Sequence, residues 1–505
     1  MDLTQEVTRN FNTSLWRELG KFTNYTPLMV GDWKGDTYTK VGNNRIVTGI
    51  PRAQALLSRA RYATTLALSS YLTNPKSFNE VYEKVKVKST VGAIPLLCLI
   101  YGCSEPPFSS LFKLSLSVNV KKWNAWNPAY AKANRYHAII SRGERRYSRG
   151  LKSPLIPGAI EVEVKYLIDS NRAKALGLSE DIIDSIRNIF EYSLKVALVV
   201  LGLGKGSSRG FGKFWYNDRG PACRDIKELL DGLLLEIEHI LKYLMSKDLL
   251  VSKDILLKPL STETIERNRM IPFFKKPDEL CSNKLFVRNA SDYGRKIELI
   301  AKAVLKANWK KASRRKGSGS NFHTWPLGLP RSSSIKCTCN GKVYEKRKYG
   351  YLVSTIAIAD LYCENFCKSF ESVSATDARR VSMIHFVPTL DGIVILPLFD
   401  YSLLPLIKGD KGRTIYHVSG KFMKHEKVKI HCDRTFVKLK NVLMNNKPKS
   451  SYRGGNCSKP TYGISLPPNS HGLFQTEPKS IEDAYVTALN AALQWVIYIL
   501  KNPLL

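Results

Sequence analysis

One segment of the chain combines bare backbone, positive charge and hydroxyl groups. It runs from Gly202 to Gly212 with the sequence Gly-Leu-Gly-Lys-Gly-Ser-Ser-Arg-Gly-Phe-Gly. A glycine lacks Cβ, so its backbone approaches an anion closely and adopts positive φ angles. Lys205 and Arg209 add charge, and Ser207 and Ser208 add hydroxyl donors. The pattern favours a site for a polyanion, and the alternative is a plain connection between a helix and a strand.

The charge of the whole chain indicates which polyanion to expect. The 505 residues include 78 Lys and Arg against 43 Asp and Glu, a formal net charge of +35, which is typical of nucleic-acid binding. No apolar run reaches membrane-spanning length, and the first residues lack a signal-peptide pattern, so we expect a cytoplasmic protein with no membrane partner. The glycine-rich loop then supplies these expected RNA contacts: Gly204, Lys205, Gly206, Ser207, Ser208, Arg209, Gly210 and Phe211.

A second basic stretch lies in the other half of the chain. A helix expected from about Tyr293 to Ala312 places Lys302, Lys306 and Lys310 on one face. The window 294–350 carries fifteen Lys and Arg against two Glu, and a solvated strip is the alternative to a binding surface. Single-stranded nucleic acid stacks on aromatic rings, and the neighbouring rings are Trp309, His323, Trp325 and Tyr344. The expected RNA contacts here are Lys310, Arg314, Arg315 and Lys316.

Hydrophobic periodicity predicts an α+β fold. Residues 112–120 and 160–166 alternate apolar with polar, as half-buried strands do. A helix with Ser179 as its N-cap extends to Leu201, and the short strand 211–216 follows the glycine-rich loop. Half-buried strands with interspersed helices favour a ferredoxin-like, RRM-like domain. We therefore expect such a domain at 1–221, and a second domain at 222–505 with basic insertions and an apolar C-terminal helix. The family resemblance given below implies that this second domain is ferredoxin-like too.

The sequence gives little reason to expect a metal or a cofactor. Ten cysteines are scattered, and Cys337-x-Cys339 with Cys363-x3-Cys367 resembles zinc-ligand spacing only loosely. Cysteine is also a common small core residue. We expect neither metal nor cofactor, and the sequence leaves disulfide formation open.

The glycine-rich loop resembles that of the RAMP superfamily of CRISPR proteins, in its ending Ser-Arg-Gly-Phe-Gly. Other segments are similar, in the same order, to the first-numbered RAMP subunit family of type III-B Cmr complexes. Thr26 to Gly31 resembles its amino-terminal strand and turn, 47–62 its arginine-rich first helix, and Leu99 to Cys103 the turn before a strand. The resemblance covers most of residues 20–220 and, beyond them, patches such as 329–333.

This resemblance implies two RAMP domains and a non-catalytic RNA-binding subunit of an antiviral ribonucleoprotein. Such a subunit lies near the 3′ end of the guide RNA and helps to engage target RNA beside other Cmr subunits. Base pairing would read sequence, while the protein holds backbones. The resemblance adds four expected RNA contacts: Arg52, Arg59, Arg61 and Arg331.

Two other function classes stay open. A RAMP-type, metal-independent endoribonuclease that processes CRISPR RNA needs a base, an acid and a cation, and Arg135, His137 and Arg142 offer such groups. Processing enzymes carry the glycine-rich loop near the carboxyl terminus, which argues against this reading. Asp32 and Asp36 imitate the catalytic aspartate of a backbone subunit, but aspartates are ordinary in turns. A structural subunit without RNA contact conflicts with the net charge.

Overall fold

The computed structural model divides the chain into two compact units. Unit 1 comprises 1–267, 271–302 and 385–399, and unit 2 comprises 268–270, 303–384 and 400–505. The structure describes residues 16–30, 38–41, 44–47, 49–72, 78–105, 107–124, 126, 152–251, 255, 280–282, 285–304, 325–328, 331–339, 342–354, 382–398, 414–420, 434–438 and 480–502. Unit 1 continues past residue 221, and the expected domain boundary there stays a prediction.

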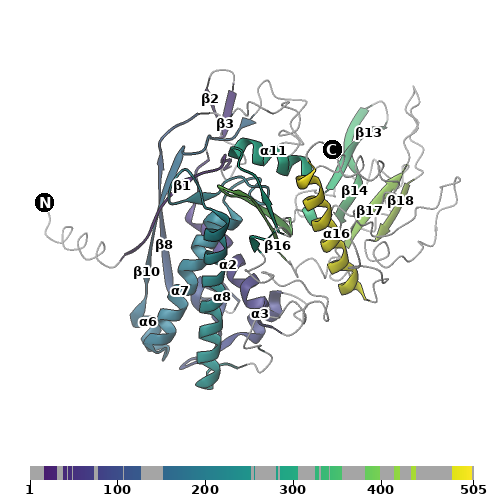
Figure 1. Ribbon diagram of the computed structural model, residues 1–505. Helices are drawn as coiled ribbons and strands as arrows, with labels where there is room; N and C mark the ends of the chain where they lie inside the picture. The colour runs from purple at the N-terminus through teal and green to yellow at the C-terminus, as the bar shows by residue number, and fades with distance from the viewer. Residues whose placement is uncertain are drawn as a thin grey trace. The chain divides into compact units, whose positions relative to one another are not determined.

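The main sheet of unit 1 has ferredoxin-like topology (Figure 1). In chain order its elements are β1 (Arg17–Asn24), α2 (Ala53–Ser69), β8 (Phe112–Val120), β10 (Ile160–Ile168), α7 (Glu180–Val196) and β11 (Phe214–Trp215). The spatial order is β11-β1-β10-β8, and every neighbouring pair is antiparallel. A β-α-β-β-α-β chain with its fourth, first, third and second strands in that order is a ferredoxin-like domain. The predicted fold class is confirmed.

Alternating side chains give this sheet one buried face. In β10, Val162 and Val164 are fully buried and lie opposite Val118 and Leu116 of β8. The expected strands and the helix after Ser179 are confirmed, although the hydroxyl of Ser179 makes no cap hydrogen bond. It lies instead 3.1 Å from the hydroxyl of Tyr243. Acidic residues in the first turn of α7 still suit the positive end of the helix dipole.

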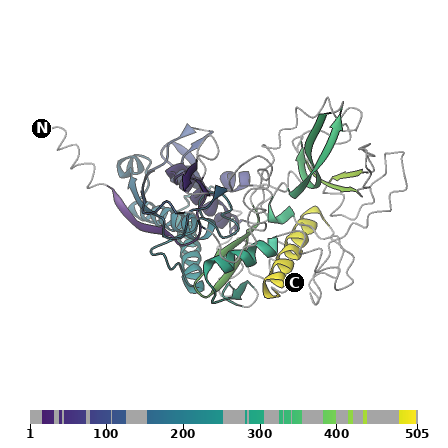
Figure 2. The same ribbon diagram turned by 90° about the horizontal axis from the view of Figure 1, so that it is seen from above.

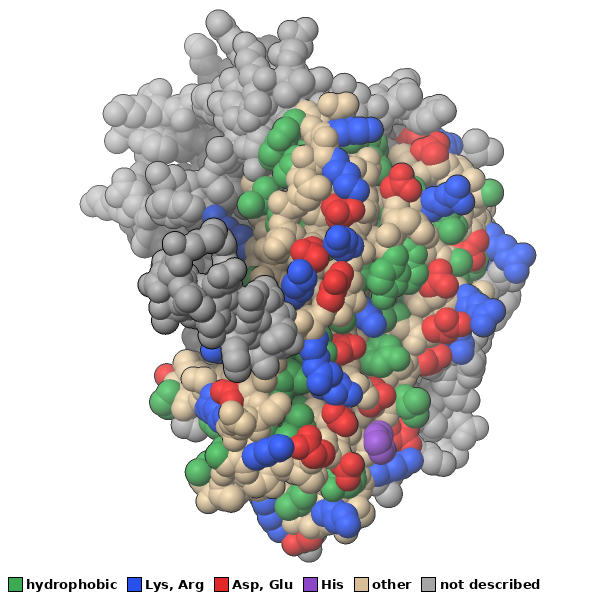
Figure 3. All heavy atoms as spheres, turned by 90° about the vertical axis from the view of Figure 1, so that its left-hand side faces the viewer, with side chains coloured by type: hydrophobic (Ala, Val, Ile, Leu, Met, Phe, Trp, Pro, Cys, Tyr) green, Lys and Arg blue, Asp and Glu red, His purple; other side chains and the backbone are tan. Residues whose placement is uncertain are grey.

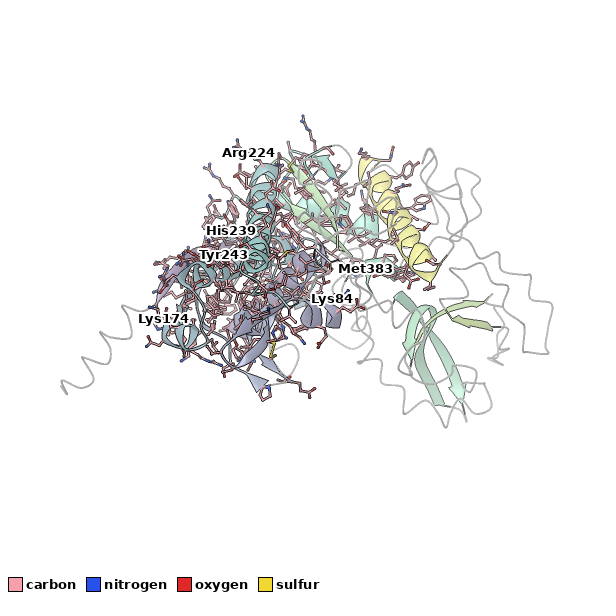
Figure 4. The ribbon with its side chains drawn as sticks, turned by 90° about the horizontal axis from the view of Figure 1, so that it is seen from below. Lys84, Lys174, Arg224, His239, Tyr243 and Met383 are labelled. Carbon is pink, nitrogen blue, oxygen red and sulfur yellow. A yellow bond between two sulfur atoms is a disulfide. The ribbon has the colours of Figure 1, made fainter. Side chains whose placement is uncertain are left out.

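Helix α8 (Cys223–Ser246) packs beside α7 over the same face of the sheet (Figure 1). A Cβ on Gly232 would overlap the ring of Tyr192, so glycine permits this close packing. Asp225 accepts a hydrogen bond from the N–H of Ala222 at 2.8 Å and caps the helix. Figure 4 shows Arg224, His239 and Tyr243 along the helix.

Shorter elements complete this part of unit 1. They are β2 (Tyr38–Val41), β3 (Asn44–Val47), α3 (Phe78–Lys84), β4 (Lys86–Ser89), β5 (Gly92–Pro95), α4 (Leu96–Tyr101), β6 (Cys103–Ser104), β7 (Pro107–Phe108), β9 (Lys152–Ser153), α6 (Ser170–Ala175) and the π-helical turn η1 (Ala197–Leu201). Disulfides join Cys98 to Cys103 and Cys223 to Cys281.

A second sheet repeats the first part of the ferredoxin-like order. It contains β12 (Phe286–Arg288), β15 (Ile384–Pro388) and β16 (Gly392–Pro397), and helix α11 (Tyr293–Val304) follows β12 in the chain. The spatial order β12-β16-β15 is the first, third and second strand. The N–H of Thr389 donates to the carbonyl of Gly392 at 2.8 Å and closes the hairpin between β15 and β16.

Unit 2 has a sheet of its own (Figure 2). The sheet order is β13 (Arg331–Cys339), β14 (Lys342–Ser354), β17 (Thr414–Gly420) and β18 (Arg434–Lys438). The 3₁₀ turn η2 (Trp325–Leu327) contacts the expected C-terminal helix, α16 (Ile481–Lys501). Over the part of the chain that the structure describes, we find no helix with the length and apolar character needed to span a bilayer.

Candidate nucleic-acid interface

The glycine-rich loop begins where the long helix α7–η1 ends. The N–H of Gly202 donates to the carbonyl of Ala197 at 2.8 Å, which completes the π-helical turn. The N–H of Leu203 then donates to the carbonyl of Gly212 at 2.8 Å and closes the neck of the loop. Gly202 has a φ of 71°, a left-handed conformation that suits glycine. The expected order of helix, glycine-rich loop and short strand is confirmed.

One side of the loop is fixed to the segment that follows β1. The N–H groups of Lys205 and Gly212 donate to the carbonyls of Met29 and Pro27, at 2.7 and 2.9 Å. A Cβ atom on Gly204 would overlap the carbonyl oxygen of Met29. Glycine at 204 is therefore required by contact within the protein, whether or not an anion binds.

The other side of the loop lies against β15. The N–H of Phe386 donates to the carbonyl of Ser208 at 3.1 Å, and Arg209 forms an isolated parallel bridge with Phe386. Phe211 is fully buried and makes an edge-on contact with Trp126, with ring centroids 6.0 Å apart. Its ring is therefore not available to stack on a base.

The part of the loop open to solvent is positively charged. Lys205 is exposed, and Ser208 and Arg209 are half-buried. The guanidinium of Arg59 on α2 donates to the hydroxyl of Ser207 at 3.2 Å, so the first helix contributes a cation to the loop. Arg52, the N-cap of α2, is exposed and precedes Arg59 by two helical turns, on the same face. Predicted cations on this side of unit 1 thus come from the start of α2 and from the loop: Arg52, Arg59, Lys205 and Arg209.

A buried lysine that the sequence analysis missed lies directly behind the loop. Lys213 is fully buried, and its ammonium group donates to the carbonyl of Val200. Burial lowers the pKa of Lys213 well below its usual range, and the charge of Arg59 lowers it further. Burial also lowers the pKa of Arg59. Lys213 follows the last glycine, but nothing in its neighbourhood in the sequence distinguishes it from an exposed lysine.

The other predicted RNA contacts serve internal packing or lie in other parts of the chain. Arg61 is half-buried and donates to the hydroxyl of Tyr82, so its guanidinium serves the packing of α2 on α3. Gly210 is buried beside Pro388 and Ile300. Arg331 lies on β13, where the structure describes the backbone alone. Lys310, Arg314, Arg315 and Lys316 lie outside the described residues, as do Asp32, Asp36 and His137.

Two other expectations from the second half can be compared with the structure. Trp325 is buried against Tyr485, with ring centroids 5.4 Å apart, so the expectation that its ring stacks on nucleic acid is wrong. Cys337 and Cys339 lie on β13, whereas 363 and 367 are outside the described residues. Within the described ranges, no group of three or more His, Cys, Asp or Glu side chains could hold a metal ion.

The outer face of the main sheet differs from an RNA-stacking surface. RRM domains stack bases on aromatic side chains of this face. Here the central strands present Lys21, Thr23, Glu161, Glu163 and Lys165, and the acids are paired with Lys121 and Lys165 at 2.7 and 3.2 Å. Acidic and basic side chains are interspersed over the side of the molecule that Figure 3 faces. The central strands therefore lack the aromatic pattern of a stacking face, whereas the edge strand β11 places Trp215 opposite Thr23.

The fold and loop define a ferredoxin-like α+β protein with a basic, glycine-rich loop at a helix end. Among solved structures, the chain is similar to "Cmr1 from Pyrococcus furiosus (apo form)", with 11% identity, a TM-score of 0.34, and coverage of 73% of this chain and 94% of that chain. It is also similar to a chain of "the Type III-B Cmr-beta bound to cognate target RNA and AMPPnP", with 12% identity, a TM-score of 0.34, and coverage of 77% and 97%.

No protein-family model matches the sequence, and no curated protein matches it.

Proposed function

We propose that this protein is a non-catalytic RNA-binding subunit of a type III-B CRISPR ribonucleoprotein in the cytoplasm. It holds the guide RNA near its 3′ end and helps to engage target RNA beside other Cmr subunits, as the sequence resemblance implies. The observation that carries the RNA-binding part is the hydrogen bond from Arg59 of α2 to Ser207, which places a helix cation beside the loop that carries Lys205 and Arg209.

The arrangement suits a phosphate backbone better than a base. Guanidinium and ammonium groups and a serine hydroxyl all donate hydrogen bonds, as phosphate oxygens require. Phe211 is buried, and the central strands of the sheet carry no outward aromatic side chain. The protein therefore holds the RNA backbone and does not read the RNA sequence. Base pairing between guide and target reads the sequence.

We expect the purified protein to bind single-stranded RNA with a steep dependence on salt. With four phosphate contacts on a single strand, the logarithm of the affinity falls with the logarithm of the salt concentration with a slope of about −2.8. This corresponds to a roughly fiftyfold fall in affinity between about 50 and 200 mM salt. Fluorescence anisotropy with labelled RNAs of equal length and different sequence measures both the slope and the sequence preference. An affinity that does not change with salt would contradict the proposal.

We also expect that the purified chain leaves RNA intact. Guide-like and repeat-containing RNAs should show no cleavage on denaturing gels, with or without divalent metal. The endoribonuclease alternative makes the opposite prediction, because it assigns base chemistry to His137. Cleavage that His137→Ala abolishes would replace our proposal with that alternative.

A further inference from the structure

The strongest unexplained feature of unit 1 is the buried ammonium group of Lys213. The backbone around it is fully engaged, since its N–H donates to the hydroxyl of Thr26 at 2.9 Å and its carbonyl accepts from the N–H of Tyr25 at 3.0 Å. Its side chain passes Gly202 so closely that a Cβ there would lie 2.9 Å from Cδ of Lys213. Lys213 therefore connects β1, the end of α7–η1 and the neck of the loop.

The end of a long helix explains how this charge is tolerated. α7 and η1 run continuously from residue 180 to 201, and the last carbonyls of a helix lack partners within it. The same end carries the negative pole of the helix dipole. The ammonium of Lys213 donates to one of these carbonyls, that of Val200. Among the described residues, no carboxylate forms an ion pair with Lys213, so the helix end is its compensating group.

The guanidinium of Arg59 links the protonation of Lys213 to ligand binding at the loop. The charge of Arg59 disfavours the protonated form of Lys213, while Arg59 itself hydrogen-bonds the loop at Ser207. An anion beside Arg59 would offset this repulsion and would favour the protonated form of Lys213. Lys213 cannot contact that anion, because its side chain is inaccessible.

We propose that Lys213 is a positioning residue of the RNA-phosphate site. By binding the Val200 carbonyl it fixes the point at which helix becomes loop, and it so holds the loop with Lys205 and Ser207 beside Arg59 in the geometry that binds a phosphate group. This inference rests on the proposed function and assigns part of the binding strength to a residue that never touches RNA.

The test compares substitutions with equal loss of charge. Lys213→Met should weaken binding of a labelled 15-nucleotide oligouridine about tenfold by anisotropy, with circular dichroism showing a retained fold. Lys247→Met, at an exposed position beyond α8, should change affinity less than twofold. Because Lys213 acts through the loop and Arg59, adding Arg59→Met to Lys213→Met should cost less than the product of the two single effects.

The outcomes separate this inference from the proposed function. If the parent protein fails to bind the oligouridine, the proposed function is wrong. If the parent binds and a folded Lys213→Met variant has the same affinity as Lys247→Met, only the positioning role is wrong. The same holds if the losses of affinity from Lys213→Met and Arg59→Met multiply fully in the double variant. Should Lys213→Met not fold, Lys213→Gln retains a donor for the Val200 carbonyl and should bind oligouridine more tightly than Arg59→Met does. An equal or weaker affinity would overturn the positioning role. In a folded Lys213→Met variant without RNA, hydrogen exchange of 202–212 should be faster than in the parent, and an unchanged rate would overturn the positioning role.

Discussion

Gly212→Ala is expected to destabilise unit 1 by on the order of 3 kcal/mol. Gly212 has a φ of 63°, and a Cβ atom there would overlap the carbonyl oxygen of Leu203. The left-handed conformation alone costs a non-glycine residue roughly 1–2 kcal/mol. The remainder arises because the neck must open and the hydrogen bond from Leu203 to Gly212 must lengthen. Thermal and urea unfolding of the purified protein measure the loss.

Gly158→Ala is the matched control for this prediction. Gly158 has a similar positive φ, 74°, and a Cβ there meets only Cβ of Asp218, at an ordinary contact distance of 3.8 Å. The control therefore contains the backbone strain without the close approach, and we expect it to cost about 1–2 kcal/mol. Equal losses for the two variants would show that the neck of the loop accommodates a Cβ and that the glycine serves conformation alone.

The main elements of the first domain could be predicted because their signals are local. The alternation in 112–120 and 160–166 recurs as β8 and β10, with the apolar positions facing the core. The apolar positions of α7 recur every three or four residues up to the glycine that ends the helix. Two-residue and helical periodicities depend on neighbouring residues alone, so the sequence displays them directly.

The partners of the glycine-rich loop could not be predicted, because they are distant in sequence. Met29 and Phe386 contact the loop from opposite directions along the chain. The sequence shows a glycine that permits a positive φ, but it does not show the carbonyl against which the glycine packs. Phe211 illustrates the same limit, since a ring within a basic loop suggests stacking on a base, whereas tertiary contacts bury it beside Trp126.

The loop is therefore a fixed element that carries charge. Its backbone is held by hydrogen bonds to the segment after β1 and to β15, and the exposed side chain of Lys205 projects from that frame. A binding site that is held rigidly by its scaffold loses less conformational entropy on binding than a mobile one. The two interpretations of the segment are therefore compatible, because its glycines serve internal packing while the proposed function assigns ligand binding to its charged side chains.

Lys205→Glu is the substitution that tests the side-chain role without disturbing the frame. Lys205 holds the loop through its N–H to Met29, and its side chain is exposed, so the exchange leaves that hydrogen bond in place. A lost charge-assisted phosphate contact is worth about 1.5–3 kcal/mol, roughly ten- to a hundredfold in affinity. We expect RNA affinity at moderate salt to fall by that factor while the unfolding temperature stays within about 2 °C of the parent.

Lys247→Glu reverses one charge on an exposed residue beyond the end of α8 and measures the effect of total charge alone. We expect less than a threefold loss of affinity from it, because a single distant charge is largely screened at physiological salt. The two variants also differ in salt dependence, since only Lys205→Glu removes a phosphate contact and reduces the log–log slope by about 0.7. Equal, small losses at both positions with unchanged slopes would mean that the loop does not contact RNA, and that the surplus charge acts on the polyanion only as a diffuse field.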